Sequence, residues 1–181
     1  IGISFPKTFT YPENVFPEIP PLDYSFVMKP TTGKGGTNVM HISNKDAYEQ
    51  AKSQLQNEPY LIQEDNVQLG KDLRVFIVGN TIVLAILREN KHDFRANYTL
   101  GGNATMYTLS DDEKILVQQI IKRYSFDFVG IDFLIGKNNE LIFNEIEDVV
   151  GSRTVSHLSN IDIIALYVEH IYQTLQNKNR L

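Results

Sequence analysis

The stretch IDFLIGKNNELIFNEIED, residues 131–148, decides the fold expected for this chain. Apolar residues run on both sides of a polar turn at Asn138 and Asn139, a pattern that indicates a β-hairpin built into a core. Three acids, Asp132, Glu145 and Glu147, interrupt the apolar runs. An ionised carboxylate is costly among core residues unless a cation or a hydrogen-bond donor meets it. The hairpin therefore poses the question of what meets these acids.

The spacing of the acids gives a geometric expectation. If Asn138 and Asn139 form a two-residue turn, Asp132 lies opposite Glu145, and Glu147 falls on the same face as Glu145. Three convergent carboxylates require a compensating cation, and oxygen-only ligands suit Mg²⁺ or Mn²⁺ rather than Zn²⁺. The alternative is a turn one residue longer, which splits the acids between the two faces and leaves each solvated at the surface. From the hairpin alone, both interpretations stay open.

The bulk composition limits the classes of protein that fit. At 181 residues the chain suits one large domain or two small lobes, and 42% hydrophobic residues suffice for an ordinary core. The formal net charge of -5 lacks the basic excess with which nucleic-acid-binding proteins neutralise phosphates. No apolar run approaches the roughly 20 residues of a membrane span. We therefore expect neither nucleic acid nor a membrane as a partner.

Cysteine usage and the start of the chain bear on its location. The chain has no cysteine, which removes disulfides and thiol nucleophiles and suits a reducing compartment, so we expect a cytoplasmic protein. It starts IGISFPKTF, without Met and without the charged and apolar regions of a signal peptide. The sequence is therefore expected to begin inside a longer protein and to lack a preceding domain.

Local patterns predict alternating hairpins and helices. Residues 1–23 are rich in proline and indicate an extended leading segment, or linker. Strands are expected over residues 24–30, 38–42 and 60–65, and on both sides of Gly79 and Asn80. Helices are expected from the capping pair Ser43 and Asp46 to about Leu55, from the capping box of Ser110 and Glu113, and over residues 162–176. This order predicts an α+β fold with mainly antiparallel sheets. The polar residues 89–108 are expected to form a long functional loop.

A glycine-rich loop follows the lysine that ends the first strand. It contains Gly33, Lys34, Gly35 and Gly36 after Lys29, and it is not a Walker A loop because it leads into a strand rather than a helix. Glycines between two strands let backbone N–H groups approach phosphate oxygens, as in the flap that covers ATP in kinases. The alternative is a mobile hairpin tip with a solvated lysine.

Arginines and acids form a third group. Asp72 and Arg74 share a strand face and could simply pair with each other, with Arg88 on the next strand. In the polar loop, Arg95 and Asn97 could hold phosphate oxygens, because arginine favours planar, bidentate contacts with such groups.

Taken in order, these pieces resemble the ATP-grasp superfamily and, within it, the RimK-like carboxylate-amine ligases. The resemblance lies in FVMKPTTGKGGTNV, YLIQED with GKDLRVFIVGN, DFRANYTLGG, FVGIDFLI and FNEIED. It implies an ATP-grasp fold of two α+β lobes that enclose the nucleotide, with a smaller lobe over residues 24–66 and a larger lobe over residues 67–181. It also implies that ATP activates a carboxylate as an acyl phosphate, which an amine then attacks.

The resemblance also implies roles for particular residues. Lys29 and Lys7 are assigned to the nucleotide phosphates, together with the flap of Gly33, Lys34, Gly35 and Gly36. Gln63, Glu64 and Asp65 are assigned to the hinge beside the adenine, Asp72 to the ribose, and Arg95, Ala96 and Asn97 to the phosphates. The metal, Mg²⁺ or Mn²⁺, is assigned to Asp132, Glu145 and Glu147. Arg88, Arg95 and Asn97 are the candidate catalytic residues that stabilise the acyl phosphate and its tetrahedral intermediate.

The chain departs from the family pattern at two places. RimK-like enzymes usually read E-x-N where this chain reads Glu145-Ile146-Glu147, so that an acid replaces a neutral amide. The following segment, DVVGSRTVS, lacks the usual Ser-Pro-Gly turn, and Arg153 within it is a candidate for binding an acidic group.

The expected function is an ATP-dependent ligase that joins a carboxylate to an amine on an amino acid, peptide or protein substrate. The alternatives are a peptide macrocyclase with the same chemistry and a nucleotide-binding module that has lost catalysis. A homo-oligomer is compatible with the sequence, which names neither the acid nor the amine.

Overall fold

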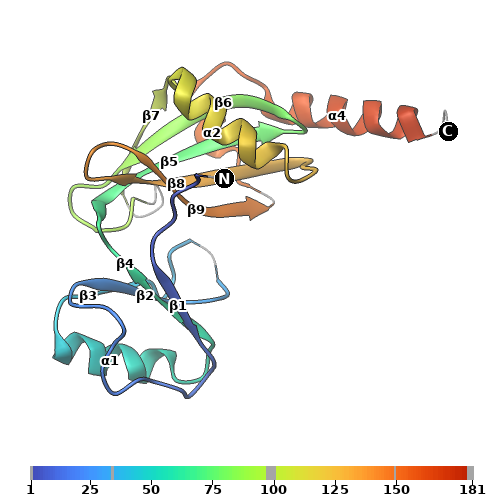
Figure 1. Cartoon of the computed structure of the whole chain (residues 1–181). Helices are drawn as coiled ribbons and strands as arrows, with labels where there is room; N and C mark the ends of the chain where they lie inside the picture. The colour runs from blue at the N-terminus through green and yellow to red at the C-terminus, as the bar shows by residue number, and fades with distance from the viewer. Residues whose placement is uncertain (1, 34, 97–100, 149, 179–181) are drawn as a thin grey trace.

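The computed structural model describes residues 2–33, 35–96, 101–148 and 150–178. Over these residues the chain forms two lobes, each built on its own antiparallel sheet (Figure 1). The smaller sheet has the strand order β1-β4-β2-β3, and the larger has the order β7-β6-β5-β8-β9. The predicted α+β fold with antiparallel sheets is therefore confirmed.

The small lobe consists of four strands and one helix. Its elements are β1 (Thr8–Tyr11), β2 (Phe26–Pro30), β3 (Met40–Ile42), α1 (Lys45–Leu55) and β4 (Tyr60–Glu64). The buried residues Tyr48, Ala51 and Leu55 of α1 pack against Phe26, Met28 and Ile62 of the sheet. The helix is capped by Asn44, whose Oδ1 accepts from the Ala47 backbone N at 3.0 Å, and not by the predicted Ser43. Residues 1–23 are more than a linker, because β1 pairs with β4 along the edge of the sheet.

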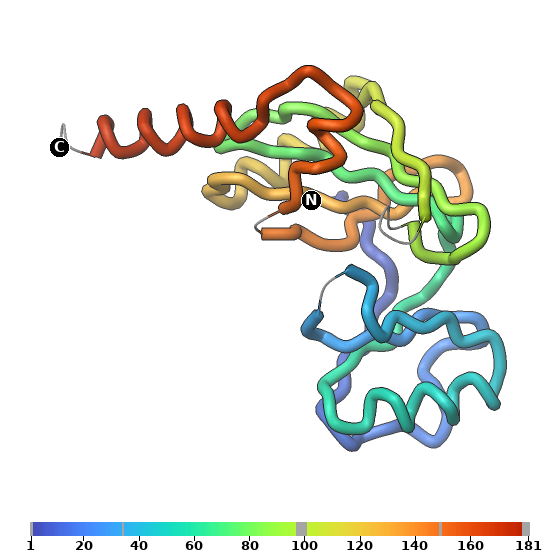
Figure 2. Tube along the Cα trace, turned by 180° about the vertical axis from the view of Figure 1, so that it is seen from behind, coloured from blue at the N-terminus to red at the C-terminus, as the bar shows by residue number. Residues whose placement is uncertain are grey.

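The large lobe has three layers. Its strands are β5 (Val67–Val78), β6 (Thr81–Glu89), β7 (Asn103–Tyr107), β8 (Phe128–Gly136) and β9 (Leu141–Asp148). The helix α2 (Asp111–Ile121) covers one face, whereas α3 (Arg153–Leu158) and the first turn of α4 (Ile163–Lys178) pack on the other (Figure 2). The Gly79-Asn80 turn and the capping box of Ser110 and Glu113 are as predicted. Two elements went unpredicted: β7 inside the expected loop, and α3.

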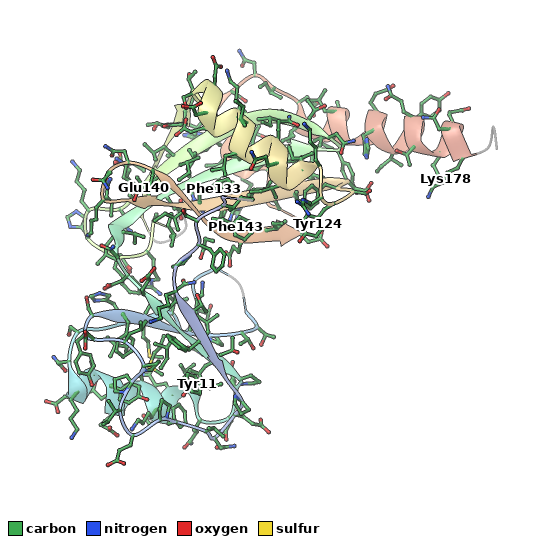
Figure 3. The ribbon with its side chains drawn as sticks, viewed as in Figure 1. Tyr11, Tyr124, Phe133, Glu140, Phe143 and Lys178 are labelled. Carbon is green, nitrogen blue, oxygen red and sulfur yellow. The ribbon has the colours of Figure 1, made fainter. Side chains whose placement is uncertain are left out.

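The helix α4 extends beyond the sheet and ends at Lys178 (Figure 3). Ile163 at its start is buried, while Ile164, Val168 and Leu175 are 49%, 58% and 55% exposed. No helix within the described residues is long and apolar enough to cross a membrane.

The acidic hairpin combines the two registers considered from the sequence. Close to the turn, Phe133 pairs with Phe143 and Ile135 with Leu141, so the turn has three residues and ends at Asn139 with a φ of 66°. A β-bulge at Asn144 then shifts the register by one residue, so that Asp132 lies opposite Glu145. The turn is thus longer than predicted, yet the predicted pair of acids still forms.

Candidate active site

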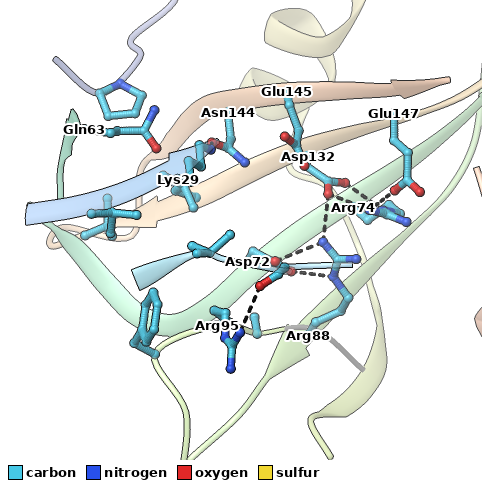
Figure 4. A pocket seen from close by; sticks show the side chains of 18 of the residues that line it. Lys29, Gln63, Asp72, Arg74, Arg88, Arg95, Asp132, Asn144, Glu145 and Glu147 are labelled. Carbon is cyan, nitrogen blue, oxygen red and sulfur yellow. Dashed lines mark hydrogen bonds and ion pairs between the residues drawn. The ribbon is translucent and has the colours of Figure 1, made fainter. Parts of the chain in front are cut away.

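A cleft of about 1380 Å³ separates the two lobes. From the small lobe it is lined by Lys29, the glycine-rich loop and the end of β4, and from the large lobe by side chains of β5, β6, β8 and β9 (Figure 4). The cleft therefore brings together residues that are more than a hundred positions apart in the sequence.

The charged floor of the cleft follows from strand alternation. Leu73, Val75 and Ile77 of β5 face the core under α2, so the alternate residues Asp72 and Arg74 face the opposite side of the sheet. On that side Asp72 pairs across the strands with Arg88 of β6, and Arg74 pairs with Asp132 of β8. Four charged side chains thus stand next to one another on three neighbouring strands. We call Asp72, Arg74, Arg88 and Asp132 the charged cluster.

The cluster is held by bidentate ion pairs. The Arg74 Nε and Nη2 donate to the two carboxylate oxygens of Asp132 at 2.7 and 2.6 Å. Arg88 donates in the same way to Asp72 at 2.6 and 2.9 Å, and its Nη2 also reaches Asp132 at 2.9 Å. Arg74 forms a further ion pair with Glu147 of β9. Such paired, charge-assisted bonds fix geometry as well as compensate charge.

Burial and pairing set the protonation of the cluster. Burial alone would raise the pKa of Asp132, but hydrogen bonds from Arg74 and the charge of Arg88 together hold that pKa below its ordinary value. Burial raises the pKa of Asp72 to about 6, because Arg88 offsets only part of the lost solvation. For Arg88, burial would lower the pKa, but Asp132 and Asp72 more than compensate and raise it. Asp132 and Arg88 are therefore charged at neutral pH.

These contacts show which groups compensate the charges of Asp132 and Glu147 in the hairpin. Arginines meet Asp132 and Glu147, and the simple pairing of Asp72 with Arg74 is wrong because each of them pairs across to a neighbouring strand. The donors Asp132, Glu145 and Glu147 are oxygen ligands of the kind that Mg²⁺ prefers. In the described part of the chain, however, no three such side chains converge closely enough to hold a metal ion. The donor chemistry fits a metal, and arginines hold two of the three acids that would bind it, Asp132 and Glu147.

Lys29 reaches the cleft from the small lobe. Its Nζ lies 3.5 Å from the Asn144 Oδ1, at the bulge of β9. Burial lowers the pKa of Lys29, and the nearby carboxylates of Glu145 and Asp132 offset part of that effect. A partly buried ammonium between these acids and the open cleft is a suitable partner for an anionic ligand.

The loop that carries Asp93 and Arg95 contacts the glycine-rich loop. Asp93 holds Arg95 through two ion-pair contacts, at 3.0 Å to Nε and 2.7 Å to Nη2, and the Arg95 Nη1 donates to the Gly36 carbonyl at 2.9 Å. Gly70 fixes the base of this loop with a φ of 73°, and a Cβ there would lie 2.3 Å from the Asn90 carbonyl oxygen. Gly33, Gly35 and Ala96 also line the cleft. The predicted residues Lys34 and Asn97 lie outside the described residues.

The predicted hinge lies in the cleft wall, where its polar side chains bond to the protein. The Gln63 Nε2 donates to the Thr8 hydroxyl at 3.1 Å, and the Glu64 carboxylate accepts from the Lys7 backbone N at 2.9 Å. Asp65 accepts from the Ser25 hydroxyl and contacts His41 Nε2, both at 2.6 Å. The Lys7 ammonium lies over the ring of Phe9, 5.3 Å from its centroid, and Lys7 is not among the residues that line the cleft.

Two cleft residues escaped the sequence reasoning. The sequence predicts Arg74 only as a partner for Asp72, although alternation along β5 places it on the cleft face. Asn144 enters through the bulge, which a residue count across the turn does not reveal. Arg153 lines the cleft as well and has no ion-pair partner among the described residues.

Comparison with known proteins places this architecture in a family. The model of the RimK-like ATP-grasp domain matches residues 3–171. The chain therefore belongs to the RimK-like ATP-grasp domain family. Among solved structures, D-cycloserine synthetase DcsG superposes with a TM-score of 0.73 at 13% identity, covering 96% of this chain and 66% of that one. The ATP-grasp ligase PsnB, complexed with minimal precursor, Mg and ADP, superposes with a TM-score of 0.68 at 20% identity, covering 96% and 54%. These two likenesses show the ATP-grasp fold.

Curated relatives share more of the sequence. N-acetylaspartylglutamate synthase A from Homo sapiens is 28% identical over 185 residues, covering 98% of this chain and 47% of the relative. A probable alpha-L-glutamate ligase from Histophilus somni (strain 2336) is 30% identical over 149 residues, covering 80% of this chain and 50% of the relative. The chain thus spans about half the length of the curated relatives it matches.

Proposed function

We propose that this chain is the ATP-binding catalytic domain of a carboxylate-amine ligase that works through an acyl phosphate. The observation that carries the proposal is the cleft between the lobes, where Lys29 and a cluster of paired arginines face the glycine-rich loop. Membership of the RimK-like ATP-grasp domain family supports it, as do the names of the relatives, which are synthases and ligases.

The chemistry needs no protein nucleophile. A substrate carboxylate oxygen attacks the γ-phosphorus of ATP, which forms an acyl phosphate and releases ADP. The amine nitrogen then attacks the acyl carbon, and the tetrahedral intermediate expels inorganic phosphate and loses a proton to leave an amide. The protein contributes positioning and compensation of charge, which are the main catalytic terms in phosphoryl transfer.

Different residues of the cleft bind the nucleotide, stabilise the reacting groups and would hold the metal. Lys29 holds a phosphate oxygen, the glycine-rich loop covers the phosphates, and the wall of Gln63, Glu64 and Asp65 lies against the adenine. Arg88 and Arg95, with Asn97, stabilise the acyl phosphate and the tetrahedral intermediate. Asp132, Glu145 and Glu147 would hold Mg²⁺, which when bound offsets the negative charge of the phosphates.

The substrate side is proposed from one residue and from the relatives. Arg153 at the cleft lacks an acidic partner in the described part of the chain, which suits it to bind a substrate carboxylate. The relatives include a probable alpha-L-glutamate ligase and an alpha-aminoadipate--LysW ligase. We propose an amino acid, a peptide or a protein as the substrate, and a cytoplasmic location because the reaction consumes ATP.

The test is substrate-dependent release of ADP. The protein is incubated with ATP, Mg²⁺ and pooled amino acids or peptides, and ADP is compared with a blank without a pool. We expect at least one pool to raise ADP release, and Lys29→Met to abolish the rise. The exposed Lys122→Met serves as the matched control and is expected to behave as the parent. Binding of ATP with no ADP from any pool would contradict the proposal and favour a binding module without catalysis.

A further inference from the structure

Arg74 occupies the space between two of the acids assigned to the metal. Its Nε and Nη2 engage both carboxylate oxygens of Asp132 at 2.7 and 2.6 Å, and Nη2 also pairs with Glu147. A divalent cation on these carboxylates needs the same lone pairs. The guanidinium and the metal therefore compete for the same oxygens.

Of the two arginines on Asp132, Arg74 is the one suited to leave. Arg88 keeps a complete bidentate pair with Asp72, at 2.6 and 2.9 Å, whatever happens at Asp132. Arg74 has no such second bidentate partner, because its guanidinium pairs mainly with Asp132. Its other partner, Glu147, lines the cleft with a side chain that is 39% exposed. Release of Arg74 from Asp132 therefore leaves Arg88 anchored and moves a cation toward the open cleft.

The fate of the released guanidinium couples the metal to the nucleotide. A metal ion alone would push Arg74 away from a buried acid without providing a new partner, which is unfavourable for a cation that is largely desolvated. Nucleotide phosphates in the cleft offer that partner, because the planar fork of arginine matches a phosphate as well as a carboxylate. Metal and nucleotide thus each favour the binding of the other.

We infer that Arg74 is an internal counter-cation that competes with the divalent metal for Asp132 and Glu147 and yields only when nucleotide phosphates are present. The inference rests on the proposed function and assigns Arg74 a positioning role. It also gives Glu147 a purpose: the acid that replaces the usual amide of the family is the second partner of Arg74.

The first experiment measures binding of Mn²⁺ without nucleotide, from the electron paramagnetic resonance signal of the free ion. We expect Arg74→Gln to tighten Mn²⁺ binding at least about tenfold, because the competing cation is gone while Arg88 still holds Asp132. Arg74→Lys keeps a positive charge and should tighten binding much less. The matched control is Arg123→Gln, an arginine just beyond the end of α2, and it should bind as the parent does. A merely structural role for Arg74 predicts weaker metal binding in Arg74→Gln.

The second experiment uses the parent chain and is independent of how the variants fold. The Arg74 Nε–H signal in a ¹⁵N spectrum, assigned by sequential correlation in the parent, is followed during addition of Mg²⁺ with ADP. We expect it to shift, while the Arg123 Nε–H signal stays unchanged. Addition of Mg²⁺ alone should shift it far less at the same concentration.

The outcomes separate the inference from the proposed function. If the parent binds Mn²⁺ with ADP but Arg74→Gln leaves nucleotide-free Mn²⁺ binding unchanged or weaker, the inference is overturned and the proposed function stands. An Arg74 signal that does not move with Mg²⁺ and ADP, in a parent that binds them, overturns it as well. If no form binds Mn²⁺ even with ADP, the metal site of the proposed function falls and the inference falls with it.

Discussion

Two ends of one sheet face carry opposite chemistry, although the same three strands build both. At the end covered by α3 and α4, the alternate positions of β5, β6 and β8 are apolar and form a core: Phe76, Val78, Leu84, Ile86 and Phe128. At the end facing the cleft, the next alternate positions are Asp72, Arg74, Arg88 and Asp132. The apolar end needs only to exclude water, whereas every group at the charged end needs a partner of opposite sign.

One sheet face can thus carry a charged cluster beside an apolar core. Burying the charged cluster would be strongly unfavourable without ion pairs. The cross-strand register provides them, because it places the guanidinium of an arginine beside the carboxylate of an aspartate on the neighbouring strand. The cluster is therefore held in place before any ligand arrives, and the contacts that a ligand would change lie on one side of it, at Arg74, Glu147 and Lys29.

The largest combined effect is expected from Asp132→Asn. The change removes a buried acid that Arg74 and Arg88 share, and breaking a buried ion pair typically costs about 3–5 kcal/mol of stability. It should also abolish Mg²⁺-dependent nucleotide binding. Urea unfolding and nucleotide titration measure the two effects. Asp111→Asn, at an acid whose side chain is 94% exposed, is the control and should change neither.

Phe76→Ala should lower the stability as strongly as Asp132→Asn does, but it should leave nucleotide binding unchanged. Phe76 is fully buried at the apolar end, and truncating such a side chain costs about 3–5 kcal/mol. We expect the affinity for nucleotide to stay unchanged at temperatures where the variant is folded. Ile115→Ala, at a residue 57% exposed on α2, should lower the free energy of unfolding by no more than about 0.5 kcal/mol. Loss of nucleotide affinity in folded Phe76→Ala would show that the two ends are not independent.

Gly130→Ala acts at the boundary between the two ends and should have a smaller effect. A Cβ at Gly130 would lie 2.8 Å from the Val150 Cγ2 and 3.2 Å from the Arg74 Cδ. Forcing a methyl group into such a space costs about 1–3 kcal/mol and would shift Arg74. Gly151→Ala, where nothing lies within 4 Å of the new atom, is the control for urea unfolding. Equal stability of the two variants would contradict the close packing of Arg74 against β8.

The smallest effect is a pH dependence that distinguishes the two acids of the cluster. Burial raises the pKa of Asp72 in the folded state to about 6 from an ordinary 3.8, so the folded state holds this proton more tightly. Its contribution to stability is therefore complete below pH 3.8 and is lost as the pH rises to about 6.

The pKa of Asp132 is lowered, so its contribution is present above its ordinary 3.8 and is lost as the pH falls through the lower folded-state pKa. The raised pKa of Asp72 is tested by urea unfolding from pH 3 to pH 7. The parent should lose stability relative to Asp72→Asn as the pH rises from 3.8 to about 6. A constant difference across that window would contradict the raised pKa of Asp72.

Periodic sequence patterns predicted most of the strands and helices, whereas the irregular features of the fold could not be predicted from the sequence. Alternation predicted the strands and the turn at Gly79, and cap residues predicted α2, because those signals are local. The bulge at Asn144 has no local signature, so the register of the acidic hairpin was reached through the wrong turn length. The partners of Arg74 lie 58 and 73 positions away, beyond the reach of any spacing rule. The resemblance to a family ordered the motifs, but it did not indicate that arginines hold Asp132 and Glu147, two of the acids assigned to the metal.

We propose that the charged end of the sheet is the metal–nucleotide site of this chain. The most direct measurement is paramagnetic broadening of backbone amide signals by Mn²⁺ with ADP. We expect the signals of Lys29, Asp132 and Glu145 to broaden first, while those of α2 on the opposite face of the sheet stay sharp. Broadening centred on α2, or none near Asp132 at saturating nucleotide, would contradict it.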